Sequence, residues 1–313
     1  MIEKKDFLQK NYVVALLAMV CCLLWGSAFP CVKTGYAMFG IGAADTASQI
    51  VFAGVRFTLA GILTVIIGSV LSRKVLVPQK TSWGMVFKLC LAQTVIQYVF
   101  FYVGMAHTSG VKGSIIEASN VFFAILISSL IFHYETLKLP KMLGVLVGFA
   151  GVVLINLNGE GFDSSMSFKG EGFLLLSTLS YACSSVLIKK YSQKENPVTL
   201  SGYQFFIGGI VMTVAGILAG GELSGFTLKS SVLLIYMAMI SAVAYSLWGI
   251  LLKHNPVGKV AVYGFMNPVF GVILSAVILK EQNQAFTFQG FVSLVLVCIG
   301  IYLVNRDFSK EKK

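Results

Sequence analysis

Two charged side chains lie deep inside long apolar runs of this sequence. Arg56 lies about nine residues into a run over 47–71, and Glu117 about seven residues into a run over 110–132. At 1.5 Å per residue, these depths are about 13 Å and about 10 Å from the same membrane face. A charge at the centre of a membrane helix costs about 2.5–3.5 kcal/mol. Two interpretations stay open: a structural ion pair, or an Arg56 that binds an anionic substrate group and a Glu117 that exchanges a proton.

Uncharged polar and aromatic side chains at similar depth could complete a binding site. Gln93 and Gln97 are one turn apart on a regular helix, and buried amides need partners, so they should face other helices or a water-filled cavity. Aromatic rings such as Trp25 could form a cavity wall for apolar or cationic groups; the alternative for an aromatic ring is the lipid interface. The candidate substrate-binding residues are Trp25, Arg56, Gln93, Gln97, Tyr98, Glu117, Asn120, Tyr245, Trp248, Tyr263 and Asn267, with Glu117 also the candidate for proton coupling.

Several neighbouring residues are assigned to other roles. Lys33 and Lys88 lie near the ends of their runs, so their ammonium groups can extend to the membrane interface. Phe101 and Tyr102 are expected to face lipid or the protein core.

The sequence has no motif for catalysis, nucleotides or metals. Gly110–Ser114 lacks the P-loop spacing, no HExxH or GxSxG occurs, and the six cysteines form no CxxC pair. We therefore expect no enzyme activity, no cofactor and no metal site. Any active transport must draw on a gradient rather than on ATP hydrolysis by this chain.

Composition places these residues in a membrane. Of 313 residues, 57% are hydrophobic and only 12% charged, whereas soluble domains carry about 45–50% and about 25%. Apolar runs long enough to span a bilayer occur at about 12–35, 47–71, 83–106, 110–132, 139–157, 171–190, 198–220, 231–252, 258–279 and 287–305. The fold class predicted is an all-α membrane protein with ten transmembrane helices.

The basic residues predict the topology. Ten spans put both termini on one side, and of 24 Lys and Arg residues only Lys112, Lys169, Lys229 and Lys280 fall in the connections on the other side. The positive-inside rule then makes both termini cytoplasmic. The net charge of +11 is attributed to this bias and to anionic lipid headgroups rather than to nucleic acid. The short chain without a targeting segment favours a cell membrane, specifically a prokaryotic inner membrane.

The chain also repeats itself at a nearly constant offset. A shift of 147 places Tyr98 on Tyr245, a shift of 148 places Arg56 on Gln204, and a shift of 146 places Glu117 on Tyr263. This predicts two five-helix repeats, 1–157 and 165–313. Because five is odd, the second repeat is inverted, an architecture that recurs in secondary transporters with the substrate site between the repeats. The alternative is an inherited fold that serves a channel or scaffold.

An ordered set of motifs marks a family resemblance. Leu24-Trp-Gly-Ser-Ala-Phe29, Arg56-Phe57 with Ala60-Gly61, Pro268-Val-Phe270 before Glu281, and Gly300-Ile-Tyr-Leu303 extend over nearly the whole chain. The sequence resembles the drug/metabolite transporter superfamily, EamA type. The resemblance implies a ten-helix carrier of small metabolites with a central cavity formed by helices 1–4 and 6–9, and with helices 5 and 10 at the periphery. One departure is Phe122, where the second repeat has Pro268.

The function predicted is an alternating-access secondary transporter for small organic metabolites, with amino acids as one candidate class. The alternative is an uncoupled channel or facilitator. Gly144 and Gly148 form a GxxxG pair, extended by Gly151, that permits close helix contact. Such contacts are more often intramolecular than intermolecular, which favours a monomer.

Overall fold

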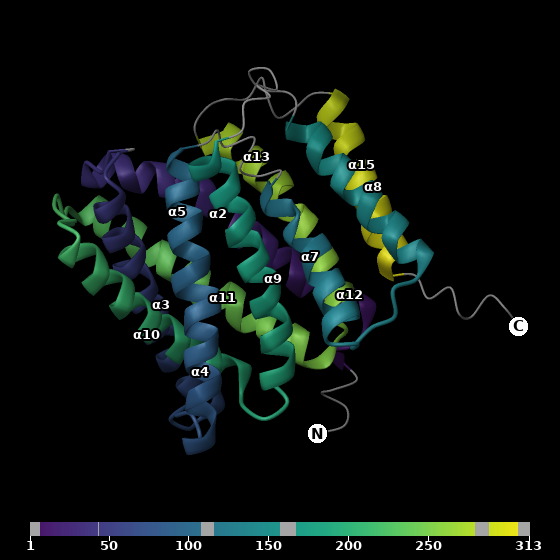
Figure 1. Cartoon of the computed structure of the whole chain (residues 1–313), viewed down its shortest axis with the longest axis horizontal. Helices are drawn as coiled ribbons and strands as arrows, with labels where there is room; N and C mark the ends of the chain where they lie inside the picture. Colours follow the sequence, from purple (N-terminus) through teal and green to yellow (C-terminus); the bar gives the residue numbers. More distant parts are fainter. Residues whose placement is uncertain (1–6, 43, 108–115, 157–166, 279–287, 306–313) are drawn as a thin grey trace, which may run out of the picture.

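The computed structural model describes residues 7–42, 44–107, 116–156, 167–278 and 288–305, and every regular element in these residues is a helix (Figure 1). The first half contains α2 (Asn11–Phe39), α3 (Thr46–Ser72), a long helix composed of η1 (Lys80–Ser82), α4 (Trp83–Leu89), η2 (Cys90–Ile96) and α5 (Gln97–Ala106), then α7 (Asn120–Leu126) with η3 (Ile127–Ile131), and α8 (Leu139–Asn156). The second half contains η4 (Phe168–Gly172) with α9 (Phe173–Tyr191), α10 (Pro197–Leu218), α11 (Leu228–His254), α12 (Val257–Ala261) with η5 (Val262–Phe265) and α13 (Met266–Ile278), and α15 (Phe288–Asn305).

Each predicted apolar run overlaps one of these helical stretches. Within the described residues, the helices long and apolar enough to cross a membrane are Asn11–Phe39, Thr46–Ser72, Lys80–Ala106, Phe168–Tyr191, Pro197–Leu218 and Leu228–His254. Shorter apolar helices cover Ile116–Ile131, Leu139–Leu154 and Phe291–Asn305. The chain is thus a multi-pass membrane protein. The predicted segments 110–115 and 279–287, with Glu281, lie outside the described residues.

Polar side chains and prolines define where several helices begin. The Asp45 carboxylate accepts from Ser48 N (3.0 Å) at the start of α3, and Thr227 with Ser230 forms a capping box at the start of α11. Asn196 caps α10, whose first residue is Pro197. These caps satisfy backbone N–H groups that would otherwise lie unpaired at the membrane boundary.

The connections between helices gather on two faces. Asn255 Nδ2 donates to Leu8 O (3.0 Å), which joins the N-terminal end to the turn after α11, and Gln79 N donates to the Glu195 carboxylate (2.9 Å), which joins the turns after α3 and α9. We call this face, made of residues 7–10, 73–79, 132–138, 192–196 and 253–257, the termini face. The opposite, far face contains 40–42, 44–45 and 219–227, where Glu222 N donates to Ser48 Oγ (3.0 Å).

Helices α3 and α10 cross at glycines related by the repeat. A Cβ atom on Gly54 would lie 2.8 Å from Gly209 O, and one on Gly61 would lie 2.7 Å from Gly202 O. The shift of 148 places Gly54 on Gly202 and Gly61 on Gly209. Each glycine therefore contacts the counterpart of the other, as two equivalent helices do when they pack antiparallel about a two-fold axis.

Helices α8 and α15 make the same kind of reciprocal contact. A Cβ on Gly144 would lie 3.0 Å from Gly300 O, and one on Gly151 would lie 2.8 Å from Ser293 O. The shift of 149 places Gly144 on Ser293 and Gly151 on Gly300. Figure 1 shows the α3–α10 pair at one end of the long axis and the α8–α15 pair at the other, so the helices between them enclose the centre of the bundle.

Candidate substrate-binding site

A cavity of about 250 Å³ lies among α2, α3, α5, the helix over Ile116–Ile131, α9, α11 and α13. It is lined by Trp25, Ala28, Phe29, Val32, Lys33, Tyr36, Gln49, Arg56, Gln97, Tyr98, Phe101, Met105, Ala106, Glu117, Asn120, Tyr181, Tyr245 and Asn267. The lining reaches the far-face ends of α2 and α5, where Lys33 is exposed.

The cavity brings together most of the predicted site residues. Trp25, Arg56, Gln97, Tyr98, Glu117, Asn120, Tyr245 and Asn267 line it, whereas Gln93, Trp248 and Tyr263 do not. Trp248 packs behind Trp25, with ring centroids 5.0 Å apart. Tyr263 lies in the 3₁₀ segment η5, and its carbonyl oxygen is 3.2 Å from Cys22 Sγ, which donates to it. These two residues support the lining from the side of the termini face.

Gln93 belongs to a separate polar network. Its Oε1 accepts from Gln204 Nε2 (2.8 Å), and Gln204 Oε1 accepts from Thr94 Oγ1 (2.7 Å), all in buried positions. The prediction that Gln93 and Gln97 share one face assumed a regular α-helix. Residues Cys90–Ile96 instead form a π-helix, whose wider turn separates side chains four residues apart.

Arg56 is held by neutral partners rather than by Glu117. Its guanidinium donates to Tyr102 Oη (2.8 Å), Ser241 Oγ (3.0 Å) and Met237 O (3.2 Å), and the side chain is 3% exposed. Among the described residues no carboxylate forms an ion pair with it. Tyr102, which was expected to face lipid or the protein core, lies in the core, and its hydroxyl accepts from Arg56.

Tyr98 and Tyr245, which the repeat relates, meet on the cavity wall through a hydrogen bond between their hydroxyl groups. The Trp25 ring lies edge-on to Tyr245, with centroids 5.1 Å apart, and Tyr181 packs edge-on to both Trp25 and Tyr245 at 6.3 Å. Edge-to-face contacts of this kind fix ring orientation. The four rings form a rigid wall where the two halves meet.

Five residues that line the cavity have a buried polar atom without a hydrogen-bond partner in the described chain. These atoms are Trp25 Nε1, Tyr36 Oη, Gln97 Oε1, Glu117 Oε1 and Asn267 Oδ1. Each such atom costs about 1–3 kcal/mol when it stays unpaired. Three of them are acceptors only, and they lie in the same cavity as the cationic groups of Lys33 and Arg56. The lining residues thus combine unpartnered acceptor atoms with two cationic side chains, which suits a ligand that carries both donors and acceptors.

Several lining residues were not predicted. Lys33 lies exposed six residues before the end of α2, and both Lys33 and Phe101 line the cavity. Tyr181 could have been found, because Tyr181 and Lys189 repeat the eight-residue spacing of Trp25 and Lys33 at a shift of 156. That offset differs from the others, because the connection after the fifth run lengthens it.

Metal-ligand chemistry does not explain the cavity. In the part of the chain that the structure describes, no three His, Cys, Asp or Glu side chains cluster as a metal site. The polar groups here are amides, hydroxyls and single charges, which suit an organic ligand.

Cavities between membrane helices are where transporters bind small molecules. Comparison with known proteins agrees: the family model described as the EamA-like transporter family matches residues 13–157 and 168–306, and the chain belongs to this family.

Relatives and a solved structure support this assignment. An uncharacterized transporter of Synechocystis sp. is 29% identical over 90% of this chain and 87% of its own length. A protein of Escherichia coli named "Probable amino-acid metabolite efflux pump" is 24% identical over 94% of each chain. A crystal structure 14% identical in sequence has a TM-score of 0.78 and covers 97% of this chain and 100% of that chain; this similarity concerns the fold alone.

Proposed function

We propose that this transporter moves small zwitterionic metabolites, with α-amino acids as the substrate class, by alternating access. The observation that carries the proposal is the set of unpartnered polar atoms on residues that line the cavity. Gln97 Oε1, Glu117 Oε1 and Asn267 Oδ1 accept hydrogen bonds, which suits an ammonium group. The relative named for amino-acid metabolites in Escherichia coli supports the same class.

Cationic groups suit the other end of such a substrate. Lys33 lines the cavity, and Arg56 uses three of its five N–H donors on protein partners. A carboxylate can bind to the remaining donors or to Lys33 through charge-assisted hydrogen bonds. Phe29 and Phe101 provide apolar contact for a side chain. The volume of about 250 Å³ is below the roughly 300–1,000 Å³ typical of drug-sized ligands, which favours a small metabolite.

The proposed architecture has ten transmembrane helices in two inverted repeats, 1–157 and 165–313. The reciprocal antiparallel crossings of α3 with α10 and of α8 with α15 support the inversion. The excess of basic residues supports cytoplasmic termini in a cell membrane. Since Gly144 and Gly148 both contact Gly300 of the same chain, the glycine stripe is used internally, which favours a monomer.

Glu117 is the proposed proton-exchanging group. Its Oε1 is buried in the cavity wall and has no partner in the described chain, so substrate and proton can compete for the same carboxylate. Binding of an ammonium group to an ionised Glu117 would displace a proton. Transport would then be exchange of substrate for a proton across the membrane.

Reconstitution into liposomes tests the proposal. Purified protein is assayed with an amino-acid panel, with amines that lack the carboxylate and with carboxylates that lack the amine, with and without a proton gradient. We expect saturable transport that requires both charged groups. Flux that does not saturate would instead indicate an uncoupled channel.

The residue test is Glu117→Gln, with Glu222→Gln as the matched control. Glu222 lies exposed on the far face outside the cavity lining, and the chemical change is the same. Glu117→Gln should abolish gradient-driven accumulation and retain counterflow, because exchange does not require reprotonation, while Glu222→Gln should behave as wild type. Full accumulation by the Glu117→Gln protein would remove the proton-coupling role.

A further inference from the structure

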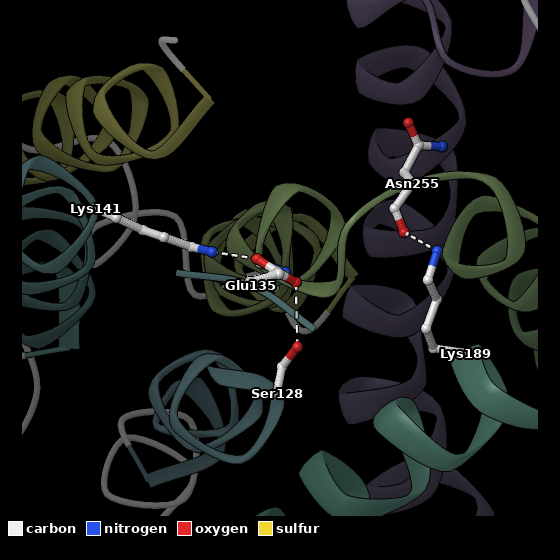
Figure 2. Close-up of polar contacts among 6 residues, drawn as sticks. Ser128, Glu135, Lys141, Lys189 and Asn255 are labelled. Atoms are coloured by element: carbon white, nitrogen blue, oxygen red, sulfur yellow. Dashed lines mark hydrogen bonds and ion pairs between the residues drawn. The ribbon is translucent and has the colours of Figure 1, made fainter. Parts of the chain in front are cut away.

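The termini face is closed by a lysine that binds the end of a helix. Lys189 Nζ, at the end of α9, donates to Asn255 O (2.7 Å) and lies 3.4 Å from Lys253 O at the end of α11 (Figure 2). Carbonyl groups at a helix C-terminus lack intrahelical partners and carry the negative end of the helix dipole, so they attract a cation. Gln193 Nε2 also donates to Lys253 O (3.0 Å), and Asn255 is buried. This contact joins the end of α9 to the end of α11 at the termini face.

The repeat gives Lys189 a counterpart at the far face. The shift of 156 that relates Tyr181 to Trp25 also relates Lys189 to Lys33. Lys33 lines the cavity and is exposed, and no hydrogen bond or ion pair binds it within the described residues. The two lysines thus occupy positions that the repeat relates but differ in their contacts. Lys189 is hydrogen-bonded at the termini face, and Lys33 has no such partner among the described residues at the far face.

The acceptor of Lys189 has a counterpart too. The shift of 147 that relates Tyr245 to Tyr98 places Lys253, at the end of α11, on Ala106, which is the last residue of α5. Ala106 lines the same cavity as Lys33. At the termini face the lysine and the helix end are in contact, and at the far face the corresponding lysine and helix end both line the cavity.

We propose that Lys189 and Lys33 are alternating latches of the transport cycle: Lys189 holds the termini face closed by binding the end of α11, and Lys33 closes the far face by binding the end of α5 in the opposite state. The inference rests on the proposed alternating access. Only one latch is engaged at a time, so each lysine stabilises one of the two states. Loss of either lysine shifts the equilibrium toward the state that the other one holds.

The test uses two reporter positions, one at the termini face and one at the far face. Ser192 is fully buried beside Lys189, whose carbonyl accepts from its hydroxyl (3.2 Å), and the shift of 156 relates it to the cavity-lining Tyr36. Ala106 is the reporter for the far face. Each is changed to cysteine in a chain whose native cysteines are replaced, and the rate of maleimide labelling is measured in nanodiscs.

Lys189→Gln should raise the labelling rate of Ser192→Cys by about tenfold, the equivalent of 1.4 kcal/mol, and lower that of Ala106→Cys. Lys33→Gln should do the opposite, because it destabilises the state closed at the far face. Lys189→Arg, which still donates to carbonyl groups, should label as the unmodified reporter chain.

Lys190→Gln is the matched control. Lys190 is the next residue of the same helix, but its ammonium group makes a cation–π contact with Phe132, 5.7 Å from the ring centroid. An equal rise in labelling with Lys190→Gln, no change with Lys189→Gln, or the same direction of change with Lys33→Gln would overturn the latch. Labelling reports conformation and not flux. A chain that transports amino acids but labels identically in all variants refutes the latch alone. Redistributed labelling in a chain that transports none of the panel refutes the substrate class alone.

Discussion

Tyr102→Phe tests how Arg56 is stabilised inside the membrane. The substitution removes one oxygen atom, the acceptor of the 2.8 Å hydrogen bond from Arg56 Nη1, and leaves the ring in place. Tyr102 is fully buried, so water cannot readily replace the lost acceptor. The other partners of Arg56 are Ser241 Oγ and Met237 O, and both are neutral. Within the described residues the hydrogen-bond acceptors of this charge are these three neutral groups, and the Phe57 ring adds a cation–π contact at 5.0 Å.

The expected magnitude follows from these contacts. A hydrogen bond to a charged group contributes about 1.5–3 kcal/mol, so Tyr102→Phe should lower the free energy of unfolding by about 2 kcal/mol. Ser241→Ala should cost a similar amount. Arg56→Lys keeps the charge, but one ammonium group cannot match the three directions in which the planar guanidinium donates, so it should also destabilise the protein.

The assay is reversible unfolding in mixed micelles by titration with a denaturing detergent. Tyr12→Phe is the control, because Tyr12 is 64% exposed at the start of α2 and loses the same atom. Equal stability of the Tyr102→Phe and Tyr12→Phe proteins would refute the view that neutral hydrogen bonds hold Arg56.

Further perturbations test the aromatic wall, the helix crossing and the termini face. Tyr98→Ala should raise the half-saturation concentration of transport by about tenfold, or 1.4 kcal/mol, and unchanged kinetics in correctly inserted protein would place the substrate elsewhere. Gly61→Ala should destabilise the chain by about 1–3 kcal/mol in detergent titration, because its Cβ would lie 2.3 Å from Phe206 N, whereas Gly84→Ala meets nothing within 4 Å and should be neutral. Burial alone would raise the pKa of the Glu195 carboxyl, but backbone hydrogen bonds and a nearby lysine outweigh it and lower that pKa. Glu195 should thus stabilise the fold above the ordinary carboxyl pKa and lose this contribution as the pH falls through its lowered value, so Glu195→Gln should flatten the acid limb of unfolding measured from pH 7 to pH 3.

The sequence predicts the helical fold well, because its main signals are local. Apolar runs locate the helices, and the nearly constant offset of 146–149 residues predicts the repeat without any knowledge of contacts. The same offset predicts that Tyr98 and Tyr245 oppose each other, and the two hydroxyl groups are hydrogen-bonded. The number of spans stays a prediction, because Ile116–Ile131 and Leu139–Leu154 are short helices by length and composition.

The parts of the site that the sequence misses depend on irregular backbone and on partners far away in the chain. The π-helix over Cys90–Ile96 turns Gln93 toward Gln204, and no periodic pattern of apolar residues indicates such a turn. An ion pair of Arg56 with Glu117 was one interpretation because the two residues lie at similar depth in the membrane. Similar depth does not determine on which side of its helix each side chain lies. The actual partners of Arg56 on α11, Met237 and Ser241, are 181 and 185 residues away.

The charges of the cavity come from one half of the chain. Lys33, Arg56 and Glu117 precede residue 157, whereas the lining residues after 165 are Tyr181, Tyr245 and Asn267. A substrate bound to Arg56 and Glu117 would stay with the first half while the second half moves, so these two contacts would change little between states. This is the condition for a carrier, since a large difference in affinity between states would trap the substrate in one of them.

Arg56 is the exception to this division. Two of its hydrogen bonds, to Ser241 Oγ and to Met237 O, cross from α3 of the first half to α11 of the second. Movement of α11 relative to α3 must break or replace these bonds, and a substrate carboxylate is a stronger acceptor for a guanidinium than a hydroxyl group is. Substrate binding would then free α11 from Arg56 and lower the barrier to the conformational change. For this reason we expect Ser241→Ala, which removes one of these bonds in advance, to speed the substrate-free exchange between states.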